Sequence, residues 1–148
     1  MEHNSLQEQN LSNNLATIGR RSVAFVIDDF IASIFFIVIF YEQIASYTDM
    51  LSMMAFIQQN VWVLMAIKVI YHTFFIATNG ATLGKYIVKI KVVNEESGEL
   101  LSWSMAFVRA LVRTAGEMLL YFTFIFAFAN PKRQTLQDKL AKSVVINA

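Results

Sequence analysis

Two long runs of apolar residues dominate the hydrophobic pattern along the chain. The first covers about residues 22–41 (SVAFVIDDFIASIFFIVIFY), and the second covers about residues 61–78 (VWVLMAIKVIYHTFFIAT). Each is close to the ~20 residues that a helix needs to cross the hydrocarbon core of a bilayer. Neither run contains Pro or Gly, so each predicts one uninterrupted transmembrane helix.

A third apolar run covers about residues 103–129, and its two halves differ. The first half carries Arg109, Arg113 and Glu117, which are spaced four residues apart and therefore share one face of a helix. The second half is uncharged and rich in Phe. This run either lies along the interface and enters the membrane as a re-entrant segment, or it crosses completely. The predicted fold class is an all-α membrane protein with two clear spans and this third segment.

A small β-element is expected beside the helices. Residues 86–93 (YIVKIKVV) alternate Lys with Val and Ile, which predicts a strand with one solvent-facing side. Residues 94–99 (NEESGE) are typical of a turn, and residues 143–146 (SVVI) form a second β-like run. The two runs can pair only if they lie on the same side of the membrane.

The head of the chain, residues 1–17, is rich in Asn, Gln and Ser. It is expected to be a flexible polar segment. A short interfacial helix with Leu11, Leu15 and Ile18 on one face is the alternative. Residues 18–146 then form the membrane domain.

The distribution of Lys and Arg predicts the orientation, because cytoplasmic loops carry an excess of both residues. Arg20 and Arg21 precede the first run, and the loop at 42–60 has no Lys or Arg. The N-terminus is therefore expected in the cytoplasm and this loop outside. The second loop and the tail also favour the cytoplasm, through Lys85, Lys89, Lys91, Lys132, Arg133, Lys139 and Lys142. A cytoplasmic tail requires a re-entrant third segment, whereas three complete crossings would place the tail outside.

Composition supports a membrane protein and excludes several other classes. Hydrophobic residues make up 56% of the 148 residues and charged residues 16%, against roughly 45–50% and about 25% in soluble domains. A net charge of +1 argues against binding of nucleic acid through bulk charge. There is no Cys, and the two His form no catalytic or zinc motif with other residues. We therefore expect no enzymatic activity, no metal and no cofactor.

Charged residues within the apolar runs are the candidates for function. A charge at the centre of a bilayer costs about 2.5–3.5 kcal/mol on insertion scales, so each such residue needs a partner or a function. Asp28 lies seven residues after Arg21, on the same helix face and ~10 Å deeper. Lys68 lies at a depth similar to that of Asp28 or Asp29, so an ion pair between the two helices is reasonable.

These charges allow a relay of protons or cations, or a structural function. In the relay hypothesis Asp28 is the carboxylate that binds a proton or monovalent cation, and Lys68 is its counter-charge. Asp29 and Glu117 are further candidates for the relay. In the structural hypothesis the same ion pairs hold the helices in register, and the protein is an accessory or scaffold that recruits a partner through its cytoplasmic loop and tail.

Three arginines are expected at the membrane surface. Arg20 lies at the start of the first run, and Arg109 and Arg113 lie in the first half of the third run. We expect all three to contact anionic lipid headgroups, since long basic side chains reach the interface easily. A stripe of Arg109 and Arg113 that faces the protein interior is the alternative.

Several of these segments resemble the RDD family of small bacterial membrane proteins. The family is named after one Arg and two Asp, which correspond here to Arg21 and Asp28 in RRSVAFVIDDF and to Asp138 in RQTLQDKLAKSVVI. The segments GATLGKYIVKIKVVNEESGELLS and AFVRALVR are also similar, and the resemblance covers about residues 18–146. Two departures are the adjacent Asp29, which competes for the place of the second Asp, and Gln137, where similar sequences often have His.

The resemblance implies a multi-pass protein of the bacterial inner membrane. It also implies transport of cations or small solutes, because some relatives are associated with sodium–proton exchange. A chain with about three spans can hardly surround a pathway alone, so a homo-oligomer is expected. The expected partners are the lipid bilayer and a monovalent cation or proton.

Overall fold

Two long helices form the frame of the fold, α2 (Ile18–Ile39) and α5 (Val61–Asn79). The computed structural model describes residues 2–119, 127–128 and 130–148. Within this part of the chain, these are the two helices long and apolar enough to cross a membrane. Thr17 caps the start of α2, and Gly80 ends α5 in the left-handed conformation with φ 70°. Both predicted spans are confirmed as helices, within four residues at each end.

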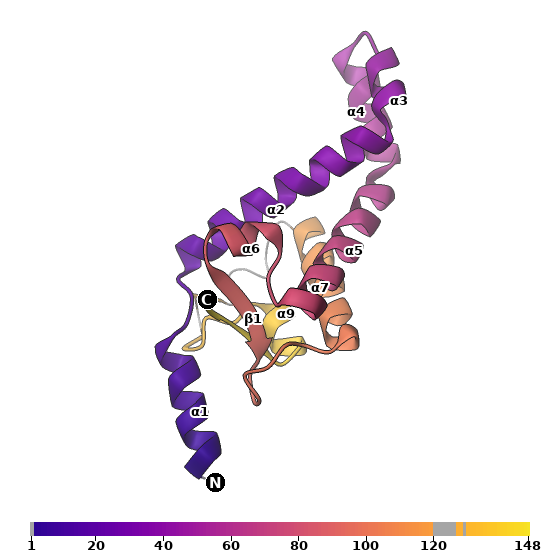
Figure 1. Cartoon of the computed structure of the whole chain (residues 1–148). Helices are drawn as coiled ribbons and strands as arrows, with labels where there is room; N and C mark the ends of the chain where they lie inside the picture. Colours follow the sequence, from indigo (N-terminus) through magenta and orange to yellow (C-terminus); the bar gives the residue numbers. More distant parts are fainter. Residues whose placement is uncertain (1, 120–126, 129) are drawn as a thin grey trace.

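Helices α2 and α5 meet at one end of the molecule, where two short helices connect them (Figure 1). These are α3 (Tyr41–Ser46) and α4 (Met50–Gln59), so much of the expected first loop is helical. The carboxylate of Asp49 accepts a hydrogen bond from Ser52 N at 2.8 Å and caps the start of α4.

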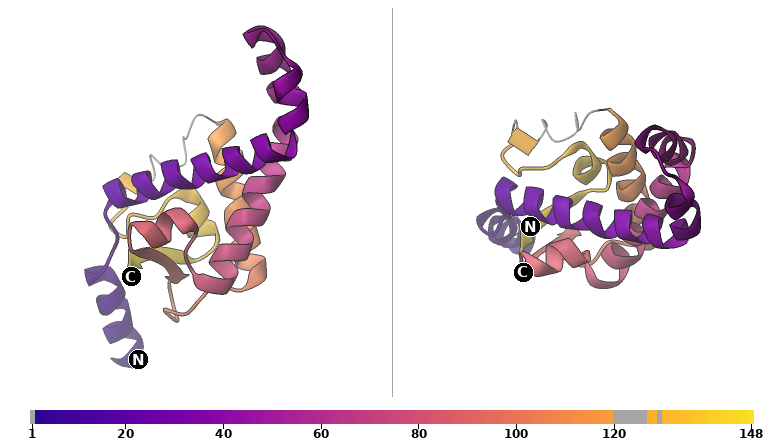
Figure 2. Two further views of the ribbon diagram at one scale, coloured as in Figure 1. Left: turned by 45° about the horizontal axis from the view of Figure 1, so that its top comes forward. Right: turned by 90° about the horizontal axis from the view of Figure 1, so that it is seen from above.

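The other end of the molecule holds the remaining elements (Figures 1 and 2). They are α6 (Leu83–Ile87), β1 (Ile90–Asn94), α7 (Trp103–Met118), α9 (Leu136–Leu140) and β2 (Ser143–Asn147). Helix α7 packs along α5, α6 packs against α2, and α9 packs against α7. Segments from both halves of the sequence therefore surround the first part of α2.

Strands β1 and β2 form a two-stranded antiparallel sheet that runs in register from Ile90 opposite Asn147 to Asn94 opposite Ser143. The pairing of the second loop with the tail is confirmed, so both lie on one side of any membrane. The predicted start of the first strand is wrong. Residues 86 and 87 belong to α6, and the positive φ of Lys89 (56°) separates that helix from β1.

The sheet does not have the expected solvent-facing side. Val92 and Val93 point to opposite faces of β1, and both are fully buried. Val93, Val144 and Ile146 pack against Leu11 and Leu15 of the head.

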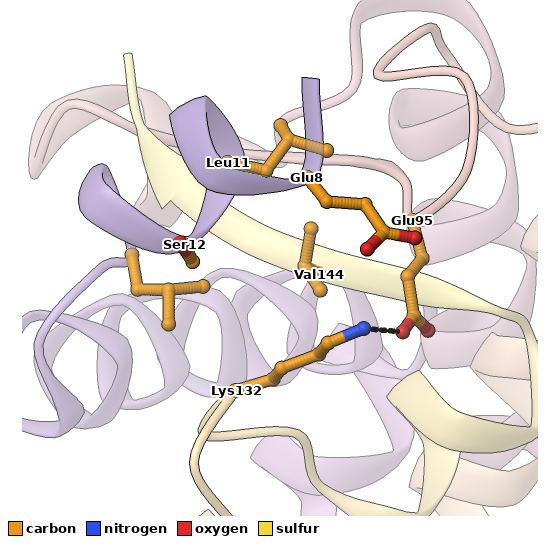
Figure 3. A pocket seen from close by; sticks show the side chains of 7 residues that line it. Glu8, Leu11, Ser12, Glu95, Lys132 and Val144 are labelled. Carbon is orange, nitrogen blue, oxygen red and sulfur yellow. Dashed lines mark hydrogen bonds and ion pairs between the residues drawn. The ribbon is translucent and has the colours of Figure 1, made fainter. Parts of the chain in front are cut away.

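The head covers the sheet because it forms helix α1 (Glu2–Asn13) rather than the expected flexible segment. Figure 3 shows Leu11 of α1 above Val144 of β2, beside an ion pair between Lys132 and Glu95. The chain after α1 joins the sheet, since Ala16 N donates to Val145 O at 2.9 Å. The structure therefore favours the helical alternative for the head. This helix packs on the sheet, whereas the alternative placed it at the membrane interface.

The first half of the third apolar run is helix α7. Residues 120–126 and 129 of the second half lie outside the described residues. The choice between a re-entrant segment and a complete crossing therefore stays a prediction. The third segment is therefore supported as a helix over Trp103–Met118.

The surface of α2 shows the reverse of the pattern in soluble proteins. Its buried stripe consists of Arg21, Ala24, Asp28, Ala32 and Phe36, whereas Val26, Phe30 and Val38 are about two-thirds exposed. Large exposed apolar side chains around a buried polar stripe are typical of a helix in lipid. This pattern and the two spanning helices indicate a lipid bilayer environment.

Candidate functional site

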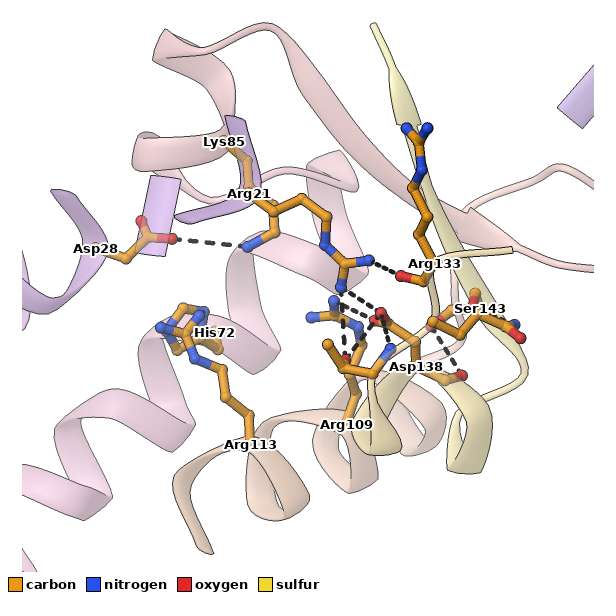
Figure 4. Close-up of polar contacts among 11 residues, drawn as sticks. Arg21, Asp28, His72, Lys85, Arg109, Arg113, Arg133, Asp138 and Ser143 are labelled. Atoms are coloured by element: carbon orange, nitrogen blue, oxygen red, sulfur yellow. Dashed lines mark hydrogen bonds and ion pairs between the residues drawn. The ribbon is translucent and has the colours of Figure 1, made fainter. Parts of the chain in front are cut away.

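Nine charged side chains of the described residues gather between α2, α5, α6, α7 and α9, and Figure 4 shows those around Asp28 and Asp138. We call the nine side chains the polar core. They form three groups of ion pairs, which centre on Asp28, on Asp138 and on Lys68. The nine residues are Arg21, Asp28, Asp29, Lys68, Lys85, Arg109, Arg113, Glu117 and Asp138.

Asp28 is completely buried and joins α2 to α5 and α6. Its Oδ1 accepts hydrogen bonds from Tyr71 Oη at 2.8 Å and Gly84 N at 2.9 Å. Its Oδ2 accepts one from Thr82 Oγ1 at 2.6 Å and lies 3.7 Å from Lys85 Nζ. These three hydrogen bonds occupy most of the roughly four lone-pair positions of the carboxylate, and the Lys85 ammonium adds a longer ion-pair contact.

Close contact between α2 and α6 depends on Gly84. A Cβ atom at this position would collide with the carbonyl oxygen of Ala24 and would lie 2.8 Å from Asp28 Oδ1. Gly84 therefore allows its own backbone N–H to reach the Asp28 carboxylate. Ala24 on the facing turn of α2 is also small, which keeps the two backbones near each other.

Lys85 enters the polar core from α6 and is only 6% exposed. Burial lowers the pKa of its ammonium to about 7, because the charged form loses its hydration. Asp28 opposes this change, whereas the nearby Arg113 and Arg109 lower the pKa of Lys85 further. The charge of Lys85 is therefore less stable than that of a surface lysine.

Asp138 is the second centre and is also completely buried. Its Oδ1 accepts from Arg109 Nη2 at 2.6 Å, and its Oδ2 forms an ion pair with Arg21. Thr135 donates to Oδ2 through its N–H at 3.0 Å and its hydroxyl at 2.9 Å, which fixes the start of α9. Burial alone would raise the pKa of Asp138, but Arg21, Arg109 and the Thr135 N–H lower it below its usual range.

Lys68 is the third centre and lies between two carboxylates from different helices. Its Nζ forms an ion pair with Asp29 of α2 and another with Glu117 of α7, at 2.7 Å from Glu117 Oε2. Asp29 is partly exposed, whereas Lys68 and Glu117 are about nine-tenths buried at their side chains. Arg113 Nε adds a further contact at 3.3 Å from Glu117 Oε1.

Arg113 connects this third group with the rest of the polar core. Its guanidinium lies 4.4 Å above the ring centre of Phe25, and its Nη1 lies 3.4 Å from His72 Nδ1. His72 is buried beside Tyr71, whose hydroxyl binds Asp28. Glu117 and Arg113 thus connect Lys68 with His72, which packs against the Tyr71 ring beside Asp28.

The structure changes two assignments that rest on sequence alone. Lys68 is not the counter-charge of Asp28, because it pairs with Asp29 and Glu117. Arg109 and Arg113 do not contact lipid headgroups, because each is only 4% exposed and faces a buried carboxylate. Arg20 is exposed, and its Nη1 donates to Asn147 Oδ1 at 3.1 Å.

The residues of the Arg and Asp pattern come together in space. Arg21 contacts Asp138 directly, although 117 positions of sequence separate them. Asp28 lies two helical turns after Arg21, on the same buried face of α2. Sequence reasoning missed Lys85, Tyr71 and Thr82 as partners of Asp28. The spacing of Thr82 and Lys85 is a helix-cap signal that could have placed Lys85 in a buried first turn rather than in a loop.

The described residues contain no group of three or more His, Asp or Glu side chains arranged to hold a metal ion. Every carboxylate of the polar core instead faces Lys or Arg. The arrangement can stabilise buried charge, and the ammonium of Lys68 serves two carboxylates at once.

Comparison with protein families gives a match over most of the chain. The model of the RDD family matches residues 15–142. This range contains Arg21, Asp28 and Asp138, together with all other members of the polar core.

Proteins with partial similarity are known from mycobacteria. A protein named proline-rich antigen homolog from two strains of Mycobacterium tuberculosis is 35% identical over 69 residues, which are 47% of this chain and 29% of the relative. The proline-rich antigen of Mycobacterium leprae is 33% identical over 67 residues, or 45% of this chain and 27% of the relative. The match thus spans under a third of these relatives. No solved structure matches the chain.

Proposed function

This chain belongs to the RDD family, and we propose that it moves protons or monovalent cations across the bacterial inner membrane. The observation that carries the proposal is the position of Lys68 between Asp29 and Glu117. We call these three residues the triad. Asp29 and Lys68 lie near the middle of the two spanning helices, where ionisable residues mark ion pathways.

The triad is suited to exchange because one ammonium group serves two carboxylates. A proton that binds to Glu117 or Asp29 removes the negative charge that holds Lys68 on that side. Lys68 then remains with the other carboxylate. A monovalent cation that replaces the ammonium at one carboxylate has the same effect, so binding at the triad shifts contacts between α2, α5 and α7.

The triad also has a route to the surface. A groove of about 340 Å³ between α5 and α7 is lined by Lys68 and Glu117 together with Val61, Leu64, Met65 and Met118. Asp29 is about one-third exposed on the side of α2. Ions can therefore reach this group more easily than Asp28, which is completely buried and accepts three hydrogen bonds.

The geometry favours Asp29 and Glu117 as the relay carboxylates, with Asp28 as the residue that joins the helices. Asp28 was the first candidate because of its depth and its place in the family pattern. Its three hydrogen bonds from Tyr71, Thr82 and Gly84, and its ion pair with Lys85, instead support a structural function.

The orientation and assembly of the protein are part of the proposal. Arg20 and Arg21 before α2, and the basic residues around the sheet, favour a multi-pass protein with the N-terminus and sheet in the cytoplasm. The two spanning helices of the described residues cannot surround a pathway alone, so we propose that copies of the chain associate into a homo-oligomer.

The test is ion-driven proton flux in proteoliposomes that contain the full chain and a trapped pH-sensitive dye. Gradients of Na⁺, K⁺ and Li⁺ are applied in turn to the wild type, to Glu117→Gln and to Asp29→Asn. Glu99→Gln is the matched control, because Glu99 is an exposed carboxylate in the turn before α7. We expect flux in the wild type and the control, and loss of most flux in both triad variants.

An accessory or scaffold protein without transport is the competing function. It predicts no flux above empty vesicles for any of the three cations, with all four proteins folded. That result would reject the proposed transport of cations, and the triad would then serve to hold α2, α5 and α7 together.

A further inference from the structure

A small, partly open cavity lies beside the cationic side chains of the polar core. It has a volume of about 20 Å³, and its lining consists of Arg21, Phe25, Lys85, Arg109, Arg113 and Gln137. Four of these six side chains are cationic. A cavity of this size holds roughly one water-sized particle.

The geometry points to this cavity as a binding site for one small monovalent anion of about the size of chloride, held by Arg21, Lys85, Arg109 and Arg113. The four cationic side chains come from α2, α6 and α7 and line this cavity. Figure 4 shows Lys85 toward Asp28, Arg21 and Arg109 toward Asp138, and Arg113 beside His72. This site differs from the triad, and it does not depend on the proposed function.

Unpartnered donors are the first support for an anion. Arg109 Nε and Arg113 Nη2 are buried and have no hydrogen-bond partner among the described residues. Leaving a buried charged donor without a partner is unfavourable, so such groups usually face a water or an ion. Both guanidinium groups line the cavity, and each is only 4% exposed.

Gln137 gives a second indication. Its Oε1 is also buried without a partner, although it faces a cavity lined by cations. The oxygen and nitrogen of a side-chain amide are assigned by their hydrogen bonds, and a half-turn exchanges them. With its NH2 group toward the cavity, Gln137 becomes a further donor to an anion.

Charge balance in the polar core points the same way. Five cationic side chains face four carboxylates, so the polar core has one excess positive charge when every group is ionised. Asp28 and Asp138 are already engaged by three or more donors each. One bound anion neutralises the excess without the loss of a proton from any group.

The weakly held proton of Lys85 is consistent with this excess charge. Its pKa of about 7 reflects burial first and then the neighbouring arginines, and a bound anion would raise it. Anion binding is therefore expected to strengthen as the pH falls through about 7. The charged and titratable groups that face Lys85 are Asp28 and Arg21 of α2, Arg109 and Arg113 of α7, and His72 of α5.

The size of the cavity limits the kind of anion. Sulfate and phosphate have five heavy atoms each, whereas the cavity holds about one water-sized particle. We therefore expect chloride and bromide to bind and sulfate to have no specific effect. A lipid phosphate is excluded for the same reason.

The test compares the thermal stability of the full chain in detergent at constant ionic strength, with sodium chloride replacing sodium gluconate. A ligand that binds only the folded state raises the melting temperature in a saturable way. We expect such a rise with chloride and with bromide for the wild type. Equilibrium binding of radioactive chloride to the same preparation is expected to show one saturable site for each chain.

The decisive variant is Gln137→Glu, which places a carboxylate in the cavity. Gln137 is in the first turn of α9, where a negative charge is favourable, so this variant is expected to fold. Its melting temperature in gluconate should equal or exceed that of the wild type, and its response to chloride should disappear. Gln43→Glu in α3 is the matched control, since Gln43 is exposed and far from the polar core; it should keep the response.

Two results would overturn the inference. In the first, the wild type shows no saturable chloride binding, and its melting temperature in chloride is no higher than in gluconate. A cavity that holds only water would give this result. The second is a chloride response of equal size in Gln137→Glu and in the wild type, which would place the anion elsewhere.

Discussion

Replacement of Asp138 by Asn tests how strongly the fold depends on the polar core. Asp138 balances Arg21 and Arg109, and all three side chains are more than nine-tenths buried. Asn has the same shape and its oxygen can still accept both hydrogen bonds from Thr135. The substitution therefore removes charge while it keeps most of the packing and the start of α9.

The expected loss follows from the two stranded guanidinium groups. Removal of one partner from a buried ion pair typically destabilises a protein by about 3–5 kcal/mol. Total stabilities of ~5–15 kcal/mol are usual, so Asp138→Asn should remove a large part of the free energy of unfolding. A loss of about 4 kcal/mol raises the ratio of unfolded to folded protein by almost a thousandfold.

The assay is chemical unfolding in detergent micelles, followed by tryptophan fluorescence and by the yield of folded protein. Asp49→Asn is the matched control, because Asp49 caps α4 at the exposed end of the molecule and Asn is an equally good cap. Its stability should stay close to that of the wild type. A loss below about 1 kcal/mol in Asp138→Asn would refute the argument that Asp138 balances two buried charges.

Three further predictions address other parts of the structure. Gly84→Ala should lower the melting temperature strongly because its Cβ would collide with Ala24 O, whereas Gly19→Ala, with no atom within 4 Å of the new Cβ, should not. The free energy of unfolding of the wild type should rise with pH between about 7 and 10.5, because Lys85 binds fewer protons when buried than in the unfolded chain. Lys85→Met should reduce this dependence of stability on pH, whereas Lys89→Met, at an exposed position, should not. Since the chain has no Cys, single cysteines at Ser97 and Lys139 should react with an impermeant reagent from the same side of the membrane; labelling from opposite sides would contradict the antiparallel sheet.

The long helices could be predicted well because strong local signals mark their ends. Helix α5 begins after Asn60 and ends at Gly80, whose left-handed conformation stops the helix. The sheet could be predicted in outline from the β-branched residues of its two strands. The strand start at Ile90 could not, because it depends on the positive φ of Lys89, and a Lys, unlike a Gly or an Asn, gives no sequence signal for that conformation.

Part of the polar core was predictable from the sequence, but Lys85 was missed and the pairing of the charges was not predicted. Helical periodicity places Asp28, Asp29 and Lys68 at a similar depth, yet adjacent positions on a helix point about 100° apart. The rotation of α2 against α5 therefore decides which Asp meets Lys68, and α6 contributes to that rotation through Gly84.

The arginines of α7 show a second limit. An Arg stripe can face lipid headgroups or the protein interior with the same spacing. Asp138, which partners Arg109, lies 29 positions farther along the chain, and local patterns carry no information about such a contact.

Infrared difference spectroscopy tests the relay at the triad most directly. The purified full chain is compared at high and low pH, with and without Na⁺, in the wild type, Glu117→Gln, Asp29→Asn and the control Glu99→Gln. We expect a protonated-carboxyl band that grows as the pH falls, that Na⁺ suppresses, and that is lost or reduced in the two triad variants alone. A band that is unchanged in both triad variants would contradict proton binding at Asp29 and Glu117.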